Sequence, residues 1–200
     1  MASGWQTMLK RLLEGNHTFR TTEFAGNRDH YTTIAGGQKP EALFICCADS
    51  RIEPGKITQT KAGELFVLRN VGNIIPPGDF GIAALLEFAI PQLKIPTIIL
   101  CGHSGCASIR ALDWKPTDEP VSRWLDNARE AKERVDARIP LPQTENEKNA
   151  RYRQIELENV RLQIEHLLTY PLLKKAVDAR RVEVYGLYYD LGSGELTRVT

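Results

Sequence analysis

Two short apolar runs constrain the fold of this chain more than any other feature of its sequence. Residues 42–47 (ALFICC) and 98–101 (IILC) contain no polar residue, so neither run shows the alternation of a strand with one face in water. Such runs are typical of strands in a parallel sheet that is covered on both faces. Because parallel strands need long crossover connections, we expect helices between them and an α/β fold.

Other segments fit the same architecture. Further strands are expected at residues 65–68 and 182–187, with a helix at 80–93 before the strand that ends at Cys101. Ser193-Gly194 predicts a hairpin turn into an edge strand at 195–199. The predicted fold is a central, mostly parallel sheet flanked by helices.

The N-terminal segment predicts a helical arm, residues 1–35, on a single catalytic domain that spans residues 1–200. Its first helix is expected at residues 4–14, and Gly15-Asn16 is expected to end it. Apolar side chains share one stripe of that helix: Trp5, Met8, Leu9, Leu12 and Leu13. Such a stripe packs either on its own domain or on a partner subunit.

Two charged helices are expected in the second half of the chain. Residues 123–138 alternate charge signs, which favours a solvated face. Residues 147–168 carry one apolar stripe, which predicts that this helix covers a core or a neighbouring subunit. The stripe consists of Leu157, Val160, Ile164 and Leu167.

Composition excludes several classes of function. Lys and Arg number 26 against 25 Asp and Glu, so the formal charge of +1 leaves no basic excess for a nucleic-acid backbone. No apolar run approaches the roughly 20 residues of a membrane span. The N-terminus has no apolar h-region, so we expect no signal peptide and a cytoplasmic location.

The four cysteines of the chain, at positions 46, 47, 101 and 106, indicate metal binding or catalysis rather than disulfides. Ligands of open α/β sheets bind at the carboxyl ends of strands, where Cys47-x-Asp49-x-Arg51 and His103-x-x-Cys106 are expected. Two thiolates and an imidazole are a ligand set suited to zinc. We therefore expect Cys47, His103 and Cys106 to bind Zn²⁺.

The choice between the adjacent cysteines follows from strand parity. Neighbouring residues of a strand point to opposite faces, so Cys46 and Cys47 cannot easily reach one metal. Cys47 shares its parity with Asp49 and Arg51 and lies nearer the strand end, so we assign it as the ligand. Cys46 and Cys101 are expected to be small core residues. The other histidines, His17, His30 and His166, lie in polar contexts and are expected to be solvated.

Four segments resemble the signatures of the β-class carbonic anhydrases. They are Gln38-x-Pro40, Phe44-Ile45-x-Cys47-x-Asp49-Ser50-Arg51, Gly63-Glu64-Leu65-Phe66-Val67-x-Arg69-Asn70-Val71-x-Asn73 and Gly102-His103-Ser104-x-x-Cys106. Their order and gaps match from the N-terminal helix to the last strands. A weaker resemblance, from Glu158-Asn159-Val160 to Thr169-Tyr170-Pro171, is to cyanobacterial carboxysomal members, which implies a location within a carboxysome as an alternative to the free cytoplasm.

The resemblance implies roles for individual residues. Cys47, His103 and Cys106 match the zinc ligands of the family, and Asp49 and Arg51 match its catalytic pair. The substrate contacts of the family match Gln38, which is expected to cross from a neighbouring subunit, and an apolar pocket of Phe66, Val71 and Phe88. The implied assembly is a homodimer or tetramer, and the implied substrates are carbon dioxide and bicarbonate.

This sequence departs from the family pattern at two positions. Ala107 replaces the glycine that usually follows the second cysteine, so its backbone N–H can face substrate only where φ suits a residue with a Cβ. Phe44 stands where a subgroup with an inhibitory bicarbonate site carries tryptophan. We expect this chain to lack that regulation, although it retains Arg69.

The metal ligands predict a catalytic site rather than a structural one. Structural zinc sites normally have four protein ligands, whereas three are available here. Asp49 is the candidate fourth ligand in a closed state, but Arg51 competes for its carboxylate. In the open state Asp49 would accept a hydrogen bond and relay a proton for the reacting water. Raising the pH favours hydroxide on zinc, whereas lowering the pH leaves water, which Asp49 can displace. Activity is therefore expected to rise toward alkaline pH.

The expected reaction is the reversible hydration of carbon dioxide to bicarbonate and a proton. Two alternatives stay open from the sequence. One is hydrolysis of a carbon dioxide mimic, carbonyl sulfide or carbon disulfide, at the same zinc centre. The other is a non-catalytic zinc-containing sensor or assembly subunit, in which Asp49 stays on the metal.

Overall fold

The computed structural model describes residues 4–114 and 119–200, with side chains described from residue 7 onward within these ranges. The chain divides into two compact units, Met1–Gln38 and Lys39–Thr200. The prediction of one domain over residues 1–200 stays a prediction. Among the described residues, no helix is both long and apolar enough to cross a lipid bilayer.

The N-terminal unit is helical, as expected, but its first helix is longer than predicted. The helices are α1 (Gly4–Thr21), α2 (Glu23–Gly26) and α3 (Arg28–Ala35). The prediction that Gly15-Asn16 ends the first helix is wrong, because an exposed glycine inside a helix costs only about 1 kcal/mol. The side chain of Trp5 lies outside the described residues, and the other four members of the predicted stripe are exposed.

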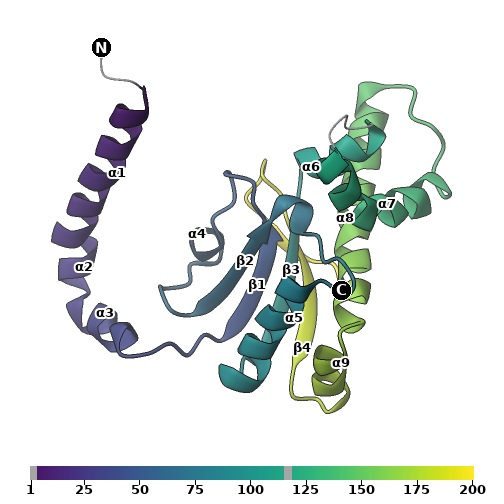
Figure 1. The fold of residues 1–200 in the computed structure, drawn as a ribbon. Helices are drawn as coiled ribbons and strands as arrows, with labels where there is room; N and C mark the ends of the chain where they lie inside the picture. The colour runs from purple at the N-terminus through teal and green to yellow at the C-terminus, as the bar shows by residue number, and fades with distance from the viewer. Residues whose placement is uncertain (1–3, 115–118) are drawn as a thin grey trace. The chain divides into compact units, whose positions relative to one another are not determined.

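The second unit contains one five-stranded sheet in the order β2-β1-β3-β4-β5 (Figure 1). β1, β2, β3 and β4 are parallel neighbours, and β5 pairs antiparallel to β4. The strands are β1 (Ala42–Cys47), β2 (Leu65–Asn70), β3 (Thr97–His103), β4 (Glu183–Tyr189) and β5 (Leu196–Arg198). The mostly parallel sheet and the terminal hairpin are confirmed.

Helical segments connect the strands. They are α4 (Pro54–Thr58), the 3-10 turn η1 (Val71–Asn73), α5 (Phe80–Glu87), the π turn η2 (Phe88–Gln92), α6 (Ala107–Arg110), the 3-10 turn η3 (Ala111–Asp113), α7 (Glu119–Asp136), α8 (Glu145–Leu168) and α9 (Pro171–Asp178). The predicted helix at 80–93 changes from α to π geometry at Phe88, because Pro91 has no N–H to continue the regular ladder.

Strand β1 is buried on both of its faces, as its unbroken apolar sequence predicts. All six of its residues are buried. Leu43 and Ile45 belong to a core cluster with residues of α5 and α9, whereas Phe44 and Cys46 belong to a second cluster with residues of α7. The end of β1 is therefore held between two packed layers, which makes it a rigid base for a site.

Helix α8 packs closely against the sheet because two glycines leave room for it. A Cβ at Gly102 of β3 would lie 2.6 Å from Cγ2 of Val160, and a Cβ at Gly186 of β4 would lie 2.8 Å from its Cγ1. Val160 is fully buried, and its β-branched side chain has little rotamer freedom in a helix. This contact sets the distance between α8 and strands β3 and β4.

Gly186→Ala is expected to lower the free energy of unfolding by about 1–3 kcal/mol, the usual cost of overpacking a core. Urea denaturation measures it. Gly15→Ala is the control, because its added Cβ meets nothing within 4 Å and should not destabilise the chain. In Gly186→Ala combined with Val160→Ala, the loss should be smaller than the sum of the single losses, and simple additivity would contradict the proposed contact.

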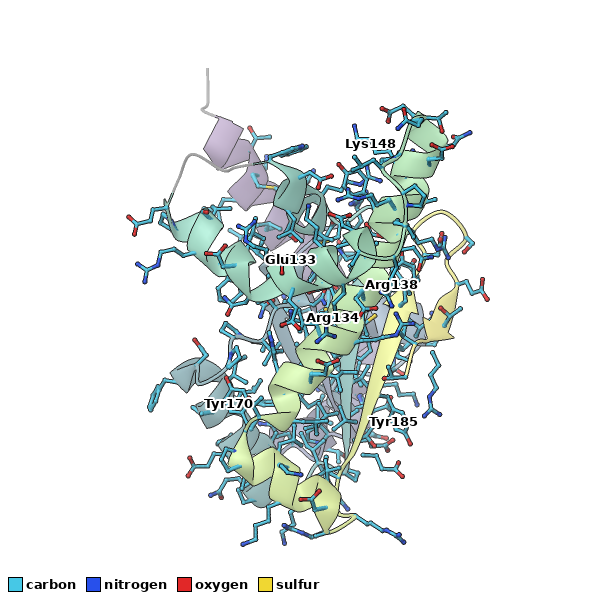
Figure 2. The ribbon with its side chains drawn as sticks, turned by 90° about the vertical axis from the view of Figure 1, so that its right-hand side faces the viewer. Glu133, Arg134, Arg138, Lys148, Tyr170 and Tyr185 are labelled. Carbon is cyan, nitrogen blue, oxygen red and sulfur yellow. The ribbon has the colours of Figure 1, made fainter. Side chains whose placement is uncertain are left out.

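The charged side chains of helix α7 are mostly exposed, as the charge pattern predicts, but Lys132, Arg134 and Asp136 are partly buried. Arg134 does form the expected pair with Glu130 at 2.8 Å, but Arg134 and Arg138 also contact the buried Glu158 of α8 at 3.4 and 2.9 Å. Both arginines can be located in Figure 2. Because a carboxylate surrounded by cations can be buried at lower cost, these pairs hold α7 against α8.

Candidate metal centre

The strand order places the ends of β1 and β3 at the point where the sheet changes its direction of winding. The chain passes from β1 to β2 on one side and then returns to β3 on the other side of β1. Ligands of open α/β sheets bind at such a switch point, outside the carboxyl ends of the strands. Cys47 is the last residue of β1, and His103 is the last residue of β3.

The three predicted ligands lie together at this switch point. The candidate ligand atoms of Cys47, His103 and Cys106 all lie within 4.8 Å of one another. Their exposed fractions are 5%, 1% and 1%. Such a buried group of one imidazole and two thiols can be held in place before any ion binds.

The ring of His103 is oriented for a metal. Its Nδ1 lies 3.0 Å from the backbone oxygen of Ser104, which can only accept, so Nδ1 carries the hydrogen. Its Nε2 is buried and has no hydrogen-bond partner in the described structure. Because an unpaired buried ring nitrogen is costly, a metal ion bound to Nε2 would satisfy this atom.

Cys47 differs from the two cysteines of the core. The neighbouring Cys106 thiol is the main cause that lowers the pKa of Cys47, and Cys47 in turn raises the pKa of Cys106. Burial instead raises the pKa of Cys46 and of Cys101 to about 12. Thiolates are the form that binds metals, so the environment favours Cys47 over its neighbour, which agrees with the parity argument.

Each candidate ligand sulfur has a hydrogen-bonding neighbour. The backbone N–H of Gly72 points to the Cys47 Sγ at 3.4 Å, and the Ser108 Oγ lies 3.0 Å from the Cys106 Sγ. Gly72 has a φ of +78°, and a Cβ there would lie 2.8 Å from the Ser108 Oγ. Glycine is therefore required at this position for both conformation and space.

Asp49 is held away from the ligand group by Arg51. The Arg51 Nε and Nη2 donate to the two carboxylate oxygens at 2.9 and 2.6 Å, and its backbone N–H donates to Oδ1 at 3.0 Å. These hydrogen bonds hold the pKa of Asp49 well below its usual range. Asp49 Oδ2 lies 4.0 Å from the His103 Nε2, which is beyond hydrogen-bond distance. Its carboxylate is thus ionised and adjacent to the group without closing it.

Three further hydrogen bonds to backbone oxygens fix the loop that carries Asp49. The Arg51 Nη2 also donates to the oxygen of Gly105, which joins this loop to the His103–Cys106 turn at 3.1 Å. Arg69 donates to the backbone oxygens of Cys47 and Asp49 at 3.1 and 2.6 Å. Arg69 is therefore a structural clamp on the end of β1, a role that the sequence analysis did not assign to it.

The sequence analysis also missed three buried polar residues of α8. Glu156 accepts from the backbone N–H of Cys106 at 2.9 Å and from the Tyr188 hydroxyl at 2.7 Å. Asn159 donates to the oxygen of Gly72, and Gln163 accepts from the N–H of Ile75. Their spacing of three and four residues places them on one helix face. The position of this polar face next to the apolar stripe was the sequence signal that could have identified these three residues.

The remaining predicted site residues are spread over both units. Phe66 and Phe88 stack with ring centroids 6.0 Å apart, and Val71 directly precedes Gly72. No hydrogen bond or ring contact among the described residues joins the aromatic pair to the ligand group. Gln38 lies in the N-terminal unit, and its substrate role stays a prediction.

Two further expectations from the sequence concern the backbone conformation at Ala107 and the exposure of the other histidines. Ala107 is the first residue of α6 and is not among the described residues with positive φ, so its Cβ is accommodated. His17 is exposed, as expected. The prediction that His166 is solvated is wrong, because it is half-buried and its Nδ1 lies 3.0 Å from the oxygen of Ile75. Burial accordingly lowers the pKa of His166.

The donor set fits zinc. Two sulfurs and one ring nitrogen are typical protein ligands of this ion, and catalytic sites commonly supply three such ligands. Among the described residues, Cys47, His103 and Cys106 are the group of three His, Cys, Asp or Glu side chains that lie close enough together to hold a metal ion.

Comparison with known proteins gives the family. The family model described as carbonic anhydrase matches residues 42–196. A carbonic anhydrase of Synechococcus elongatus is 36% identical over 199 residues, which cover 96% of this chain and 72% of that protein. A carbonic anhydrase of Pseudomonas aeruginosa is 33% identical and covers 94% and 86%. The chain belongs to the β-class carbonic anhydrases.

Solved structures agree with this assignment. The β-carbonic anhydrase CcaA superposes with a TM-score of 0.88 at 33% identity, covering 96% of this chain and 94% of that one. A tetrameric β-carbonic anhydrase of Sordaria macrospora superposes with a TM-score of 0.86 at 29% identity, covering 96% of each chain. The predicted family and fold class are confirmed.

Proposed function

We propose that this β-class carbonic anhydrase catalyses the zinc-dependent, reversible hydration of carbon dioxide to bicarbonate and a proton. The observation that carries the proposal is the buried group of Cys47, His103 and Cys106 beside a carboxylate that Arg51 holds back. A site that only supports the fold would be expected to use the nearby carboxylate as its fourth ligand.

The residues of the site would have separate roles in this reaction. Cys47, His103 and Cys106 would hold zinc, which when bound acts as a Lewis acid and activates water. Asp49 would accept a hydrogen bond from the reacting water and pass its proton to buffer. Arg51 would keep Asp49 ionised and turned away from the metal ligands, because its planar fork satisfies both carboxylate oxygens.

The apolar residues and Ala107 would orient the substrate. Phe66, Val71 and Phe88 would supply an apolar pocket for carbon dioxide, which carries no charge. The N–H of Ala107 would face the substrate from the first turn of α6. Gln38 would complete the pocket from a neighbouring subunit.

The substrate is tested by initial rates on a single preparation whose zinc content is known. We expect rapid hydration of carbon dioxide in stopped flow and slower hydrolysis of carbonyl sulfide and carbon disulfide. A preference for either sulfur compound would replace the proposed substrate, and zinc-loaded protein inactive on all three would indicate a sensor or an assembly subunit.

A homo-oligomer is the second part of the proposal. Strand β2 is an edge of the sheet, and exposed apolar side chains accompany it: Val67, Val71 and Phe88, with exposed fractions of 44, 51 and 48%. An unpaired strand edge with apolar side chains favours association. The similarity to a tetrameric enzyme of Sordaria macrospora supports the same assembly class.

Light scattering is expected to give a mass of at least two chains. Val67→Lys, which places a charge on the edge strand, should increase the monomer fraction and lower the activity of that fraction, because Gln38 would then be missing from the pocket. Glu195→Lys is a control substitution away from β2. A fully active monomer would contradict a shared site. The cytoplasmic and carboxysomal locations stay predictions.

A further inference from the structure

The side chain of Trp124 on α7 reaches the loop that borders the metal centre. Its indole Nε1–H donates to the backbone oxygen of Val71 at 2.8 Å. That oxygen belongs to the peptide group that joins Val71 to Gly72. The N–H of the same peptide group points to the Cys47 Sγ at 3.4 Å. One peptide group therefore connects an indole donor to a candidate metal ligand.

The geometry of a trans peptide makes this connection directional. The structure contains no cis peptide bond among its described residues, so the carbonyl and the N–H of this group point in opposite directions. A hydrogen bond to the carbonyl polarises the peptide and strengthens the hydrogen bond that its N–H donates. Trp124 and Cys47 thus lie at opposite ends of one short chain of hydrogen bonds.

Neighbouring contacts prevent the peptide from relaxing. Asn159 donates to the oxygen of Gly72 at 3.2 Å, which fixes the following peptide group. Gln163 orients Asn159 by donating to its Oδ1 at 2.9 Å, and it accepts from the N–H of Ile75 at 2.7 Å. Each amide orientation is set by a backbone group that can only donate or only accept, so the network has one consistent arrangement.

We propose that Trp124 is a positioning residue for the metal centre, because its indole N–H fixes and polarises the peptide whose own N–H hydrogen-bonds to the Cys47 sulfur. The effect of that N–H is to withdraw electron density from the sulfur. Without it the thiolate becomes a stronger electron donor to the ion, and its sulfur is held less firmly beside the other two ligands. Residues that orient metal ligands in this way typically change metal affinity by about 10–100-fold.

Trp124→Phe tests the inference, because it keeps an aromatic ring and removes the N–H. The protein is loaded with cobalt(II), and its thiolate-to-cobalt charge-transfer band is recorded. We expect that band to shift to lower energy, because the sulfur is a stronger donor, and zinc release to a chelator to become about tenfold faster, because the sulfur is no longer held in position. Trp114→Phe is the matched control, since Trp114 is 65% exposed, and it should change neither measurement.

Asn159→Ala is a second variant: it frees the adjacent peptide group, whose Gly72 oxygen Asn159 holds from α8, and the same shift of the band is expected from it if Trp124→Phe does not fold. Leu162→Ala is its control, a buried residue of the same helix whose loss should lower stability without moving the band. An unchanged band and release rate in folded Trp124→Phe would overturn the inference. It rests on the proposed metal centre, so a wild-type protein without any thiolate–cobalt band would instead overturn the proposed function.

Discussion

Arg51→Ala is expected to lower the rate of carbon dioxide hydration by about 10²–10⁴-fold, the usual contribution of a positioned proton acceptor, without loss of bound zinc. Arg51 makes all three hydrogen bonds to the Asp49 carboxylate described above. Once its side chain is removed, the carboxylate can turn toward the ligand group, because its Oδ2 lies 4.0 Å from the His103 Nε2. Asp49 is then expected to become the fourth zinc ligand.

Zinc K-edge X-ray absorption on the variant measures this change. The expected spectrum has two sulfur ligands, one nitrogen ligand and a carboxylate oxygen. The Arg51 side chain is 54% exposed, so the fold should tolerate its removal. Arg51→Lys is the matched control: it keeps the charge but loses the planar fork, and it should give an intermediate rate. An Arg51→Ala protein with wild-type rates would contradict the role of the pair.

Cys47→Ser and Cys106→Ser are each expected to lose nearly all bound zinc. Structural zinc sites in zinc-finger peptides bind with about 10–16 kcal/mol, so on that scale one of three ligands accounts for roughly 3–5 kcal/mol, or about 10²–10⁴-fold in affinity. Serine keeps the size of the side chain but does not ionise near neutral pH. Elemental analysis of the purified variants, compared with the wild type, measures the loss.

Cys46→Ser and Cys101→Ser are the matched controls. Both thiols are fully buried and lie outside the group of side chains close enough to hold a metal, so neither is expected to bind zinc. Their variants should keep the zinc of the wild type, although a buried hydroxyl without a partner lowers stability. Zinc retained by Cys47→Ser and lost by Cys46→Ser would show that the ligand assignment is wrong.

The fold was predictable because its main signals are local. The unbroken apolar sequence of β1 requires two covered faces, and the turn at Ser193-Gly194 requires a hairpin. The metal group was predictable for a related reason. Strand parity and the convergence of strand ends at a switch point place Cys47 near His103 without any knowledge of long-range contacts.

The supporting residues could not be predicted in the same way. Trp124 and Arg69 act on backbone oxygens that lie 53 and 20 to 22 positions away in the sequence, and no local pattern marks such contacts. The α8 residues Glu156, Asn159 and Gln163 do share a helix face, but their polarity alone suggests solvent. Only the packing of α8 over Gly102 and Gly186 turns that face inward.

A titration of metal-free protein with zinc tests the central claim most directly. Carbon dioxide hydration is measured by stopped flow at each step, together with the zinc bound per chain. We predict that the rate rises in proportion to bound zinc and stops rising when each chain holds one ion. Protein that binds one zinc per chain at Cys47, His103 and Cys106 and yet does not hydrate carbon dioxide would contradict it.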